Sequence, residues 1–211
     1  MRMTPTIEPE YWSRALGELA GSDPVMASLI AQYPGSMLAS RGSPFYTLAR
    51  AIVGQQISVK AADAVWARFE SCVGVVVAEA VLRVPPDELR ACGLSLRKVE
   101  YVLDLARHFV DRVLRPERWA HLDDAAVTAE IVAVRGLGVW SAEMFLIFHL
   151  LRPDVFPLDD IGLQKAVALH YFDGERPKRK QLDVFGERWR PWRSIATWYL
   201  WRSLDPVPVA Y

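Results

Sequence analysis

Two adjacent aspartates, Asp159 and Asp160, end the segment VRGLGVWSAEMFLIFHLLRPDVFPLDD, which starts at Val134. A carboxylate beside a reacting centre can stabilise positive charge or activate water. An aspartate directly before the helix-like stretch IGLQKAV also suits the N-cap of that helix. The two roles are compatible. The residues alone leave open which carboxylate would do the chemistry.

A glycine corner lies about twenty residues before the aspartates. Gly136 and Gly138 allow a tight turn, and Trp140-Ser141-Ala142 begins a predicted helix. Backbone N–H groups at the start of a helix bind anions such as phosphate. Carbonyl groups on the other side of the turn could hold a monovalent cation. An ordinary corner between two helices would have the same pattern.

Tryptophan is abundant, with eight in 211 residues. Five fall in the glycine corner or after residue 188: Trp140, Trp189, Trp192, Trp198 and Trp201. Most tryptophans of a helical protein belong to its core. Flat apolar faces also form the pocket that an extruded nucleobase needs.

Metal and cofactor motifs are missing from the sequence. The four histidines are scattered, and the two cysteines, Cys72 and Cys92, are too few for an iron-sulfur cluster. No P-loop or dinucleotide fingerprint is present.

Charge and hydropathy limit which partners and which cellular location we expect. Net charge is zero, so only local basic patches could favour nucleic acid. One basic segment, 176–193, is either a solvated surface or a set of phosphate contacts. The chain has no apolar signal core and no run near the ~20 residues of a membrane span, so we expect a cytoplasmic protein with reduced thiols.

Helical periodicity runs through almost the whole chain and predicts an all-α fold. We expect Gly21 to close the first helix, and Asp23 to cap the second with Pro24 in its first turn. The run VGVVV at 73–77 is a weak strand candidate. One helix is expected to bury a single side, formed by Val59, Ala62, Val65, Trp66 and Phe69. The other helices are expected in EPEYWSRALGELAG, PFYTLARAIVGQQIS, PPDELRACGLS, LRKVEYVLDLARHFVDRVL, DDAAVTAEIVAV, KQLDVFGERW and WRSIATWYLWRSL.

Four motifs in a fixed order resemble one family. GLGVWSAEMFL followed by DVFPLDDIGLQKAV is similar to the helix-hairpin-helix and catalytic aspartate of the HhH-GPD superfamily of DNA glycosylases. AIVGQQISVKAA (51–62), GLSLRKVEYVLDLA (93–106) and RWRPWRSIATWYLW resemble its 3-methyladenine DNA glycosylase II (AlkA) branch. The similarity spans about residues 20–204.

The resemblance implies an architecture. We expect one glycosylase unit over 1–211, with two helical subdomains and the active-site cleft between them. The first subdomain would span 40–150, with the helix-hairpin-helix at about 127–150, and the second would combine 1–39 with 151–211. The N-terminal sheet domain of longer relatives has no room in this chain.

The resemblance also implies roles for single residues. The catalytic aspartate of the family falls on Asp160, and the DNA wedge falls on Gln56, a polar residue where the AlkA relative has an apolar one. Met144 stands where that relative has an aromatic residue. The full set is catalytic Asp160; base pocket Trp140, Met144 and Trp201; wedge Gln56; phosphate amides of Gly136, Gly138 and Ser141; and Na⁺ or K⁺ carbonyls of Val132, Val134 and Gly136.

The implied activity is hydrolysis of the N-glycosidic bond of alkylated purines such as 3-methyladenine and 7-methylguanine in double-stranded DNA. Bifunctional relatives carry a hairpin lysine where this chain has Trp140, so we expect a monofunctional enzyme without lyase activity. No cofactor is expected to be required, and a monomer in the cytosol or nucleoid suffices. The alternatives are a glycosylase for hypoxanthine or uracil and a DNA-binding protein without catalysis.

Overall fold

The computed structural model describes residues 9–35, 37–38, 40 and 42–204, and over these residues the chain forms helices and no strand. The all-α prediction is confirmed. The strand prediction at 73–77 is wrong, because Val73 is the last residue of one helix and Val77 is the N-cap of the next. The four residues between the two helices, 74–77, have no strand among the described residues with which to pair.

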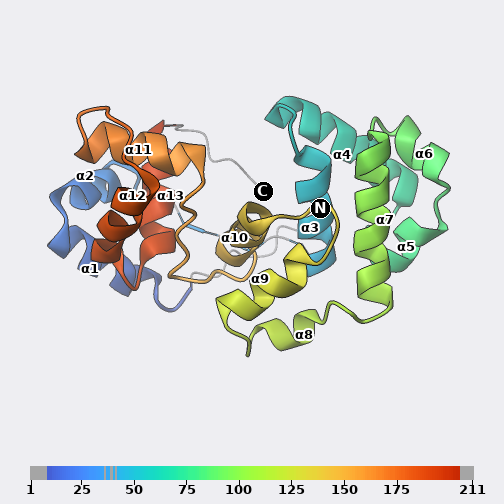
Figure 1. The fold of residues 1–211 in the computed structure, drawn as a ribbon, viewed down its shortest axis with the longest axis horizontal. Coiled ribbons are helices and arrows are strands. Elements are labelled where there is room, and N and C mark those ends of the chain that lie inside the picture. Colours follow the sequence, from blue (N-terminus) through green and yellow to red (C-terminus); the bar gives the residue numbers. More distant parts are fainter. Residues whose placement is uncertain (1–8, 36, 39, 41, 205–211) are drawn as a thin grey trace. The chain divides into compact units, whose positions relative to one another are not determined.

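The helices divide into two compact units (Figure 1). One unit is built mainly from Arg41–Phe145, and the other combines Met1–Ser40 with Leu146–Ala210. The continuous unit contains α3 (Pro44–Gly54), α4 (Val59–Val73), α5 (Ala78–Arg83), α6 (Pro86–Ala91), α7 (Leu96–Val110), α8 (Pro116–Trp119), α9 (Asp124–Val132) and most of α10 (Val139–Phe148).

In the continuous unit, α7 packs against α3, α5 and α6, and α4 packs against α3 and α6. A chain of edge-to-face aromatic contacts runs through its core from Phe45 to Phe109, Trp119 and Phe145. Side-chain caps fix where its helices begin, because each cap accepts a bond from a backbone N–H that the helix itself leaves unpaired. These caps are Ser43, Ser58, Ser95 and Asp123.

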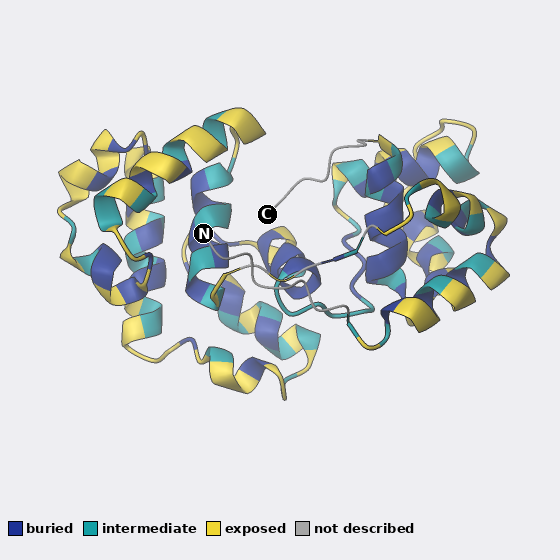
Figure 2. Ribbon diagram, turned by 180° about the vertical axis from the view of Figure 1, so that it is seen from behind, coloured by how far each residue is buried: buried dark blue, intermediate teal, exposed yellow. Residues whose placement is uncertain are grey.

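The discontinuous unit contains α1 (Trp12–Ser22), α2 (Pro24–Gln32), α11 (Ile161–Tyr171), α12 (Arg179–Gly186), the 3₁₀ helix η1 (Glu187–Trp189) and α13 (Arg193–Leu204). Its centre is α13, on which α1, α2, α11 and η1 pack. Every residue from 194 to 200 is buried, which is typical of a helix surrounded on all sides (Figure 2).

Asp23 joins three parts of the discontinuous unit at one carboxylate. It caps α2 as predicted, accepting bonds from the N–H groups of Val25 and Met26. Its other oxygen accepts bonds from the Tyr171 hydroxyl and the Trp189 indole, each at 3.0 Å. Burial, together with the Asp23 charge, raises the pKa of Tyr171. The donors leave this buried carboxylate well satisfied.

Two smaller predictions are wrong. The first helix continues past Gly21 to Ser22, where the Ser22 hydroxyl donates to the Glu18 carbonyl at 2.8 Å. Val59 is 57% exposed, because it stands at the first position of α4, before the helix reaches the core at Trp66. The short helices α5 and α8 were not predicted. Over the described residues, no helix has the length and apolar character needed to cross a membrane.

Candidate functional site

The hairpin between α9 and α10, residues 133–138, is anchored by two apolar side chains. Val134 and Leu137 are 1% and 4% exposed, and the Leu137 N–H donates to the Val134 carbonyl at 3.2 Å. The first bond of α10 runs from Ala142 N–H to the Gly138 carbonyl at 3.1 Å. The N–H groups of residues 139–141 therefore precede the first intrahelical donor, Ala142, which is the arrangement that favours an anion.

Glycine is required at 136 and not at 138. Gly136 has φ +86°, and a Cβ atom there would lie 2.2–2.6 Å from the ring of Tyr101. At Gly138 the backbone is not left-handed and an added Cβ would meet nothing within 4 Å. Tyr101 belongs to α7, so an aromatic ring of α7 lies directly under the tip of the hairpin.

Asp104, one turn after Tyr101 on α7, holds the same tip. Its carboxylate accepts a bond from the Arg135 N–H at 3.0 Å and lies 3.6 Å from the Arg135 guanidinium. Neither α7 side chain was predicted to support the hairpin. Their spacing of three residues puts both on one helix face, which the sequence shows only once the partner is known.

The turn between α3 and α4 reaches the hairpin through Gln55. Its side-chain N–H₂ donates to the Gly136 carbonyl at 2.8 Å. The next residue is the predicted wedge, Gln56, which is exposed and has φ +58°. The structure therefore places the predicted wedge directly beside a residue bonded to the hairpin.

The predicted pocket residues of α10 lie on one helix face, since Trp140 and Met144 are four residues apart. Trp140 is 38% exposed, an unusual value for a tryptophan of this protein, whereas Met144 is 5% exposed. Ser141 is 6% exposed, so the residue is largely buried, and the phosphate contact predicted for it would go through its backbone N–H.

Asp160 caps α11, as its position in the sequence predicts. Its Oδ1 accepts bonds from the Leu163 N–H at 2.6 Å and from the Trp201 indole Nε1 at 2.8 Å. The indole approaches so closely that a Cβ on Gly162 would lie 3.1 Å from both Trp201 and the Asp160 carboxylate. Glycine in IGLQKAV thus leaves room for the indole.

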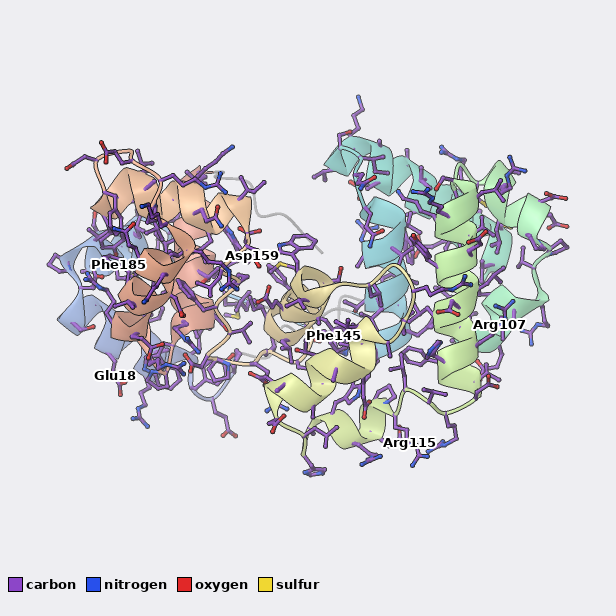
Figure 3. The ribbon with its side chains drawn as sticks, in the orientation of Figure 1. Glu18, Arg107, Arg115, Phe145, Asp159 and Phe185 are labelled. Atoms are coloured by element: carbon purple, nitrogen blue, oxygen red, sulfur yellow. The ribbon has the colours of Figure 1, made fainter. Side chains whose placement is uncertain are left out.

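Asp159 is placed quite differently from its neighbour. Its side chain, which is labelled in Figure 3, is 70% exposed and pairs with Arg179 at 3.1 Å. Among the described residues, Asp159 accepts no bond from a backbone N–H or an indole of the kind that fixes the orientation of Asp160. Of the two carboxylates that the sequence leaves equivalent, Asp160 is the one held in a defined position.

Trp201 has a second contact besides Asp160. Its ring stacks on Phe148, with centroids 5.7 Å apart and planes inclined by 13°. Trp198, one turn earlier on α13, meets Phe148 edge-on at 6.1 Å. One of the predicted base-pocket residues is therefore also the residue that orients Asp160, a role that the sequence did not reveal.

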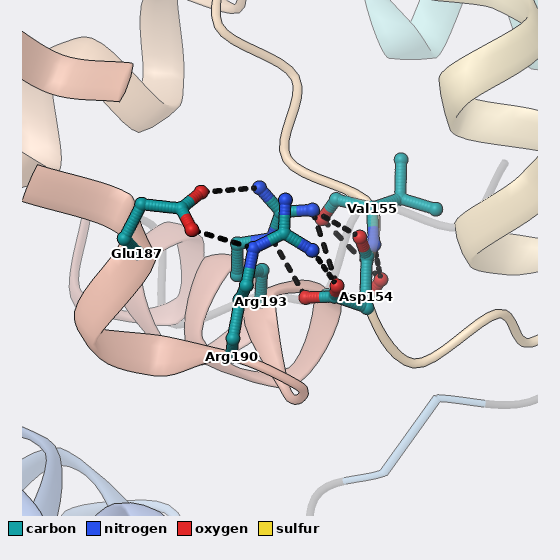
Figure 4. Close-up of polar contacts among 6 residues, drawn as sticks. Asp154, Val155, Glu187, Arg190 and Arg193 are labelled. Atoms are coloured by element: carbon teal, nitrogen blue, oxygen red, sulfur yellow. Dashed lines mark hydrogen bonds and ion pairs between the residues drawn. The ribbon is translucent and has the colours of Figure 1, made fainter. Parts of the chain in front are cut away.

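The segment 149–160, called here the Asp160 loop, is fastened to α13 and η1 by charged side chains (Figure 4). Arg193 donates to an Asp154 carboxylate oxygen at 2.7 Å and to the Asp154 carbonyl at 2.9 Å. Arg190 pairs with both Asp154 and Glu187. The hydrogen bond from Arg190 lowers the pKa of Glu187.

Uncharged groups complete the fastening of the Asp160 loop. The Ser194 hydroxyl accepts a bond from the Val155 N–H at 2.9 Å. Gln164 donates to the Leu158 carbonyl at 2.6 Å and itself accepts a bond from Arg176. In the basic segment 176–193, Arg176, Arg179, Arg190 and Arg193 thus have partners within the chain.

The predicted residues fall into two sets, one in each unit. The hairpin glycines, Ser141, Trp140, Met144 and Gln56 belong to the continuous unit, and Asp160 and Trp201 to the discontinuous unit. Over the described residues, no group of three or more His, Cys, Asp or Glu side chains could hold a metal ion.

Comparisons with known proteins agree with one another. The model of the HhH-GPD superfamily, base excision DNA repair proteins, matches residues 49–191. The putative DNA-3-methyladenine glycosylase YfjP of Bacillus subtilis is 28% identical over 188 residues, which are 85% of this chain and 66% of that protein.

Solved structures give the same result. A DNA-3-methyladenine glycosidase from Bacillus halodurans is 32% identical with a TM-score of 0.82, covering 92% of this chain and 91% of that one. The 3-methyladenine DNA glycosylase Mag1 of Schizosaccharomyces pombe, solved in complex with abasic DNA, is 26% identical with a TM-score of 0.78; 93% of this chain and 100% of that chain are covered.

Proposed function

This chain belongs to the HhH-GPD superfamily of base excision DNA repair proteins, and on that premise we propose that it is a monofunctional DNA glycosylase for alkylated purines. Relatives named 3-methyladenine DNA glycosylases support the substrate class. The single observation that carries the proposal is the fixed carboxylate of Asp160, held by the Leu163 N–H and the Trp201 indole.

The chemistry proposed for Asp160 is electrostatic. An alkylated base such as 7-methylguanine is cationic and therefore already a good leaving group. The harder task is to stabilise the positive charge that develops on the deoxyribose as the N-glycosidic bond breaks. A carboxylate held in place before the reaction does this without reorganising, and it also orients or deprotonates the attacking water.

The continuous unit is proposed to bind the DNA. The backbone N–H groups of Gly136, Gly138 and Ser141 would bind a phosphate, and Gln56 would fill the gap that the flipped nucleotide leaves. The exposed face of Trp140 would stack on the cationic base, with Met144 one turn later on the same helix. Trp201, in the other unit, is proposed for the base pocket from the family resemblance alone.

A Na⁺ or K⁺ ion at the hairpin is part of the proposal. Carbonyl oxygens such as those of Val132, Val134 and Gly136 suit these cations, and the ion would add positive charge beside the phosphate. The Gly136 carbonyl already accepts the bond from Gln55, and its second lone pair leaves capacity for an ion.

A hairpin without a nucleophile is the reason to propose hydrolysis alone. Residues 133–141 read AVRGLGVWS and contain no lysine, so no amine is available there to form a Schiff base with the sugar. The product would be an abasic site in an unbroken strand. Gel analysis of the product before and after alkali treatment would show a strand break only after alkali.

The test is release of methylated bases from duplex DNA, measured by chromatography for wild type, Asp160→Asn and Asp159→Asn. We expect Asp160→Asn to lose excision by about 10²–10³-fold or more. It should still bind abasic DNA. Asp159→Asn is the matched control, one residue away and exposed, and should remain within about threefold of wild type.

Two results would contradict the proposal. Near wild-type excision by Asp160→Asn would remove this carboxylate from the chemistry. If wild type bound abasic DNA and released no 3-methyladenine or 7-methylguanine, alkylated purines would not be the substrate. Duplexes with hypoxanthine or uracil would then separate another lesion from binding without catalysis.

A further inference from the structure

Gln55 connects two elements to which the proposed function gives separate tasks. Its side chain donates to the carbonyl of Gly136, at the tip of the hairpin, while its backbone leads directly into Gln56. The stretch GQQIS contains two adjacent glutamines, and the proposed function assigns a role only to the second, Gln56. The structure gives the first one a specific partner 81 residues away in the chain.

The turn that carries Gln56 is fixed at both of its ends. The Lys98 ammonium donates to the Val53 carbonyl at 2.7 Å, at the end of α3, and burial lowers the pKa of this lysine. The Ser58 hydroxyl caps α4 by accepting a bond from the Ala61 N–H. Only residues 54–57 lie between these two anchors, so the position of Gln56 depends on the backbone of this short turn.

Gln56 itself adopts a backbone conformation that favours glycine. Its φ of +58° is in the left-handed region, which disfavours side chains with a Cβ. Strain of this kind persists only where neighbouring contacts impose it, and it collects at functional positions. The Gln55 bond is such a contact, since it fixes the residue immediately before the strained one.

We infer that Gln55 is a positioning residue: by bonding to the Gly136 carbonyl, it keeps Gln56 in its left-handed conformation, with its side chain directed to the DNA, when the hairpin is engaged. The inference rests on the proposed function, in which Gln56 is the wedge and the hairpin binds phosphate. It adds that the two elements act as one, because the hairpin carbonyl is the acceptor that orders the turn.

Coupling of this kind is distinguishable from simple support of the hairpin. If Gln55 acts through Gln56, removing its side chain matters only while Gln56 is present. If it supports the hairpin alone, its removal weakens phosphate binding whether or not Gln56 is present. A double-mutant cycle separates the two cases, because residues that act through each other are not additive.

The experiment compares wild type, Gln55→Ala, Gln56→Ala and the double variant. Each is assayed for single-turnover excision of 7-methylguanine at saturating enzyme, and for affinity to an abasic-site duplex. We expect Gln55→Ala to lower the saturated rate about three- to tenfold, the effect of one neutral hydrogen bond, with affinity within about twofold. The double variant should be no slower than Gln56→Ala.

A second readout does not depend on catalysis. A 2-aminopurine placed opposite the abasic site reports, by its fluorescence, whether the wedge enters the duplex. Gln55→Ala should lose most of the change that wild type produces. Gln55→Met, which keeps the length of the side chain and loses the donor without adding a charge, should behave like Gln55→Ala and serves if the alanine variant folds poorly.

Additive losses in the cycle would overturn the inference, as would a Gln55→Ala effect confined to DNA affinity. A fluorescence change equal to that of wild type would also overturn it. If wild type excised no methylated base but the fluorescence still depended on Gln55, the positioning role would stand and the proposed substrate would be wrong.

Discussion

The Asp160 loop is fastened by charged and polar side chains, whereas the hairpin between α9 and α10 rests mainly on apolar ones. Asp154 receives two arginines in the first region. In the second, Val134 and Leu137 are buried and the ring of Tyr101 lies against Gly136. The two regions lie in different units and have been given different tasks.

The difference in how the two regions are held fits the groups that each would use: a side-chain carboxylate in the Asp160 loop and backbone N–H groups in the hairpin. The effect of a carboxylate depends on where its two oxygen atoms lie, and directed hydrogen bonds fix their position. Under the proposed function the hairpin would bind phosphate through backbone N–H groups, which must stay unpaired with the chain's own acceptors to do so. Apolar anchors hold the backbone without consuming those groups.

Adding a methyl group to the hairpin tip should have the largest effect of the following changes. Gly136→Ala forces a Cβ into the Tyr101 ring and requires a left-handed alanine. We expect a loss of about 2–4 kcal/mol in the free energy of unfolding, and at least tenfold weaker binding of abasic DNA. Urea unfolding and fluorescence anisotropy would measure the two.

Gly138→Ala is the matched control in the same hairpin. Its new Cβ meets nothing within 4 Å and its backbone is not left-handed, so stability should change by less than about 0.5 kcal/mol. Equal behaviour of the two variants would mean that Tyr101 does not hold the tip.

Removing one directed bond from the carboxylate should have the next largest effect. Trp201→Phe keeps an aromatic ring on Phe148 and loses the N–H that donates to Asp160. Bonds to charged groups contribute roughly 1.5–3 kcal/mol, so we expect the single-turnover excision rate to fall about tenfold or more while abasic DNA is still bound.

Trp198→Phe is its control, because Trp198 also contacts Phe148 and its Nε1 has no hydrogen-bond partner among the described residues. Excision by that variant should stay within about threefold of wild type. A similar loss in both variants would assign the effect to aromatic packing and not to the bond with Asp160.

The smallest expected effect is a pH-dependent change in stability at the ion pairs that fasten the Asp160 loop. The Arg190 hydrogen bond lowers the pKa of Glu187 in the folded protein, so its stabilising contribution is complete above about pH 4.5 and is lost as the pH falls through the lowered value. Glu187→Gln should therefore be less stable than wild type at pH 6, and the difference should shrink toward pH 3.5. Thermal unfolding at both pH values measures it; a constant difference would exclude this ion pair as the cause.

The sequence predicts the parts of this molecule that depend on local pattern. The helical class, the caps at Asp23 and Asp160 and the glycine corner all follow from residues close together in the chain. The choice of Asp160 over Asp159 as the catalytic residue came from the family resemblance and stays a prediction; the structure adds that Asp160 accepts a bond from the Trp201 indole, whereas Asp159 pairs with Arg179.

Contacts between residues far apart in the chain could not be predicted from the sequence. Tyr101, Asp104 and Gln55 reach the hairpin from segments that carry no signal for it, and Asp154 meets Arg190 and Arg193 across some forty residues. Val59 was misplaced because helical periodicity describes a face and not the point along the helix where burial begins.

The contacts of Asp23 also bear on the order in which the chain can fold during synthesis. This carboxylate needs Tyr171 and Trp189, which leave the ribosome long after α1 and α2 have done so. The continuous unit, in contrast, has all its helices once α10 has emerged. Helices α1 and α2 therefore lack their final partners during the time in which the continuous unit, which follows them in the chain, can complete its core.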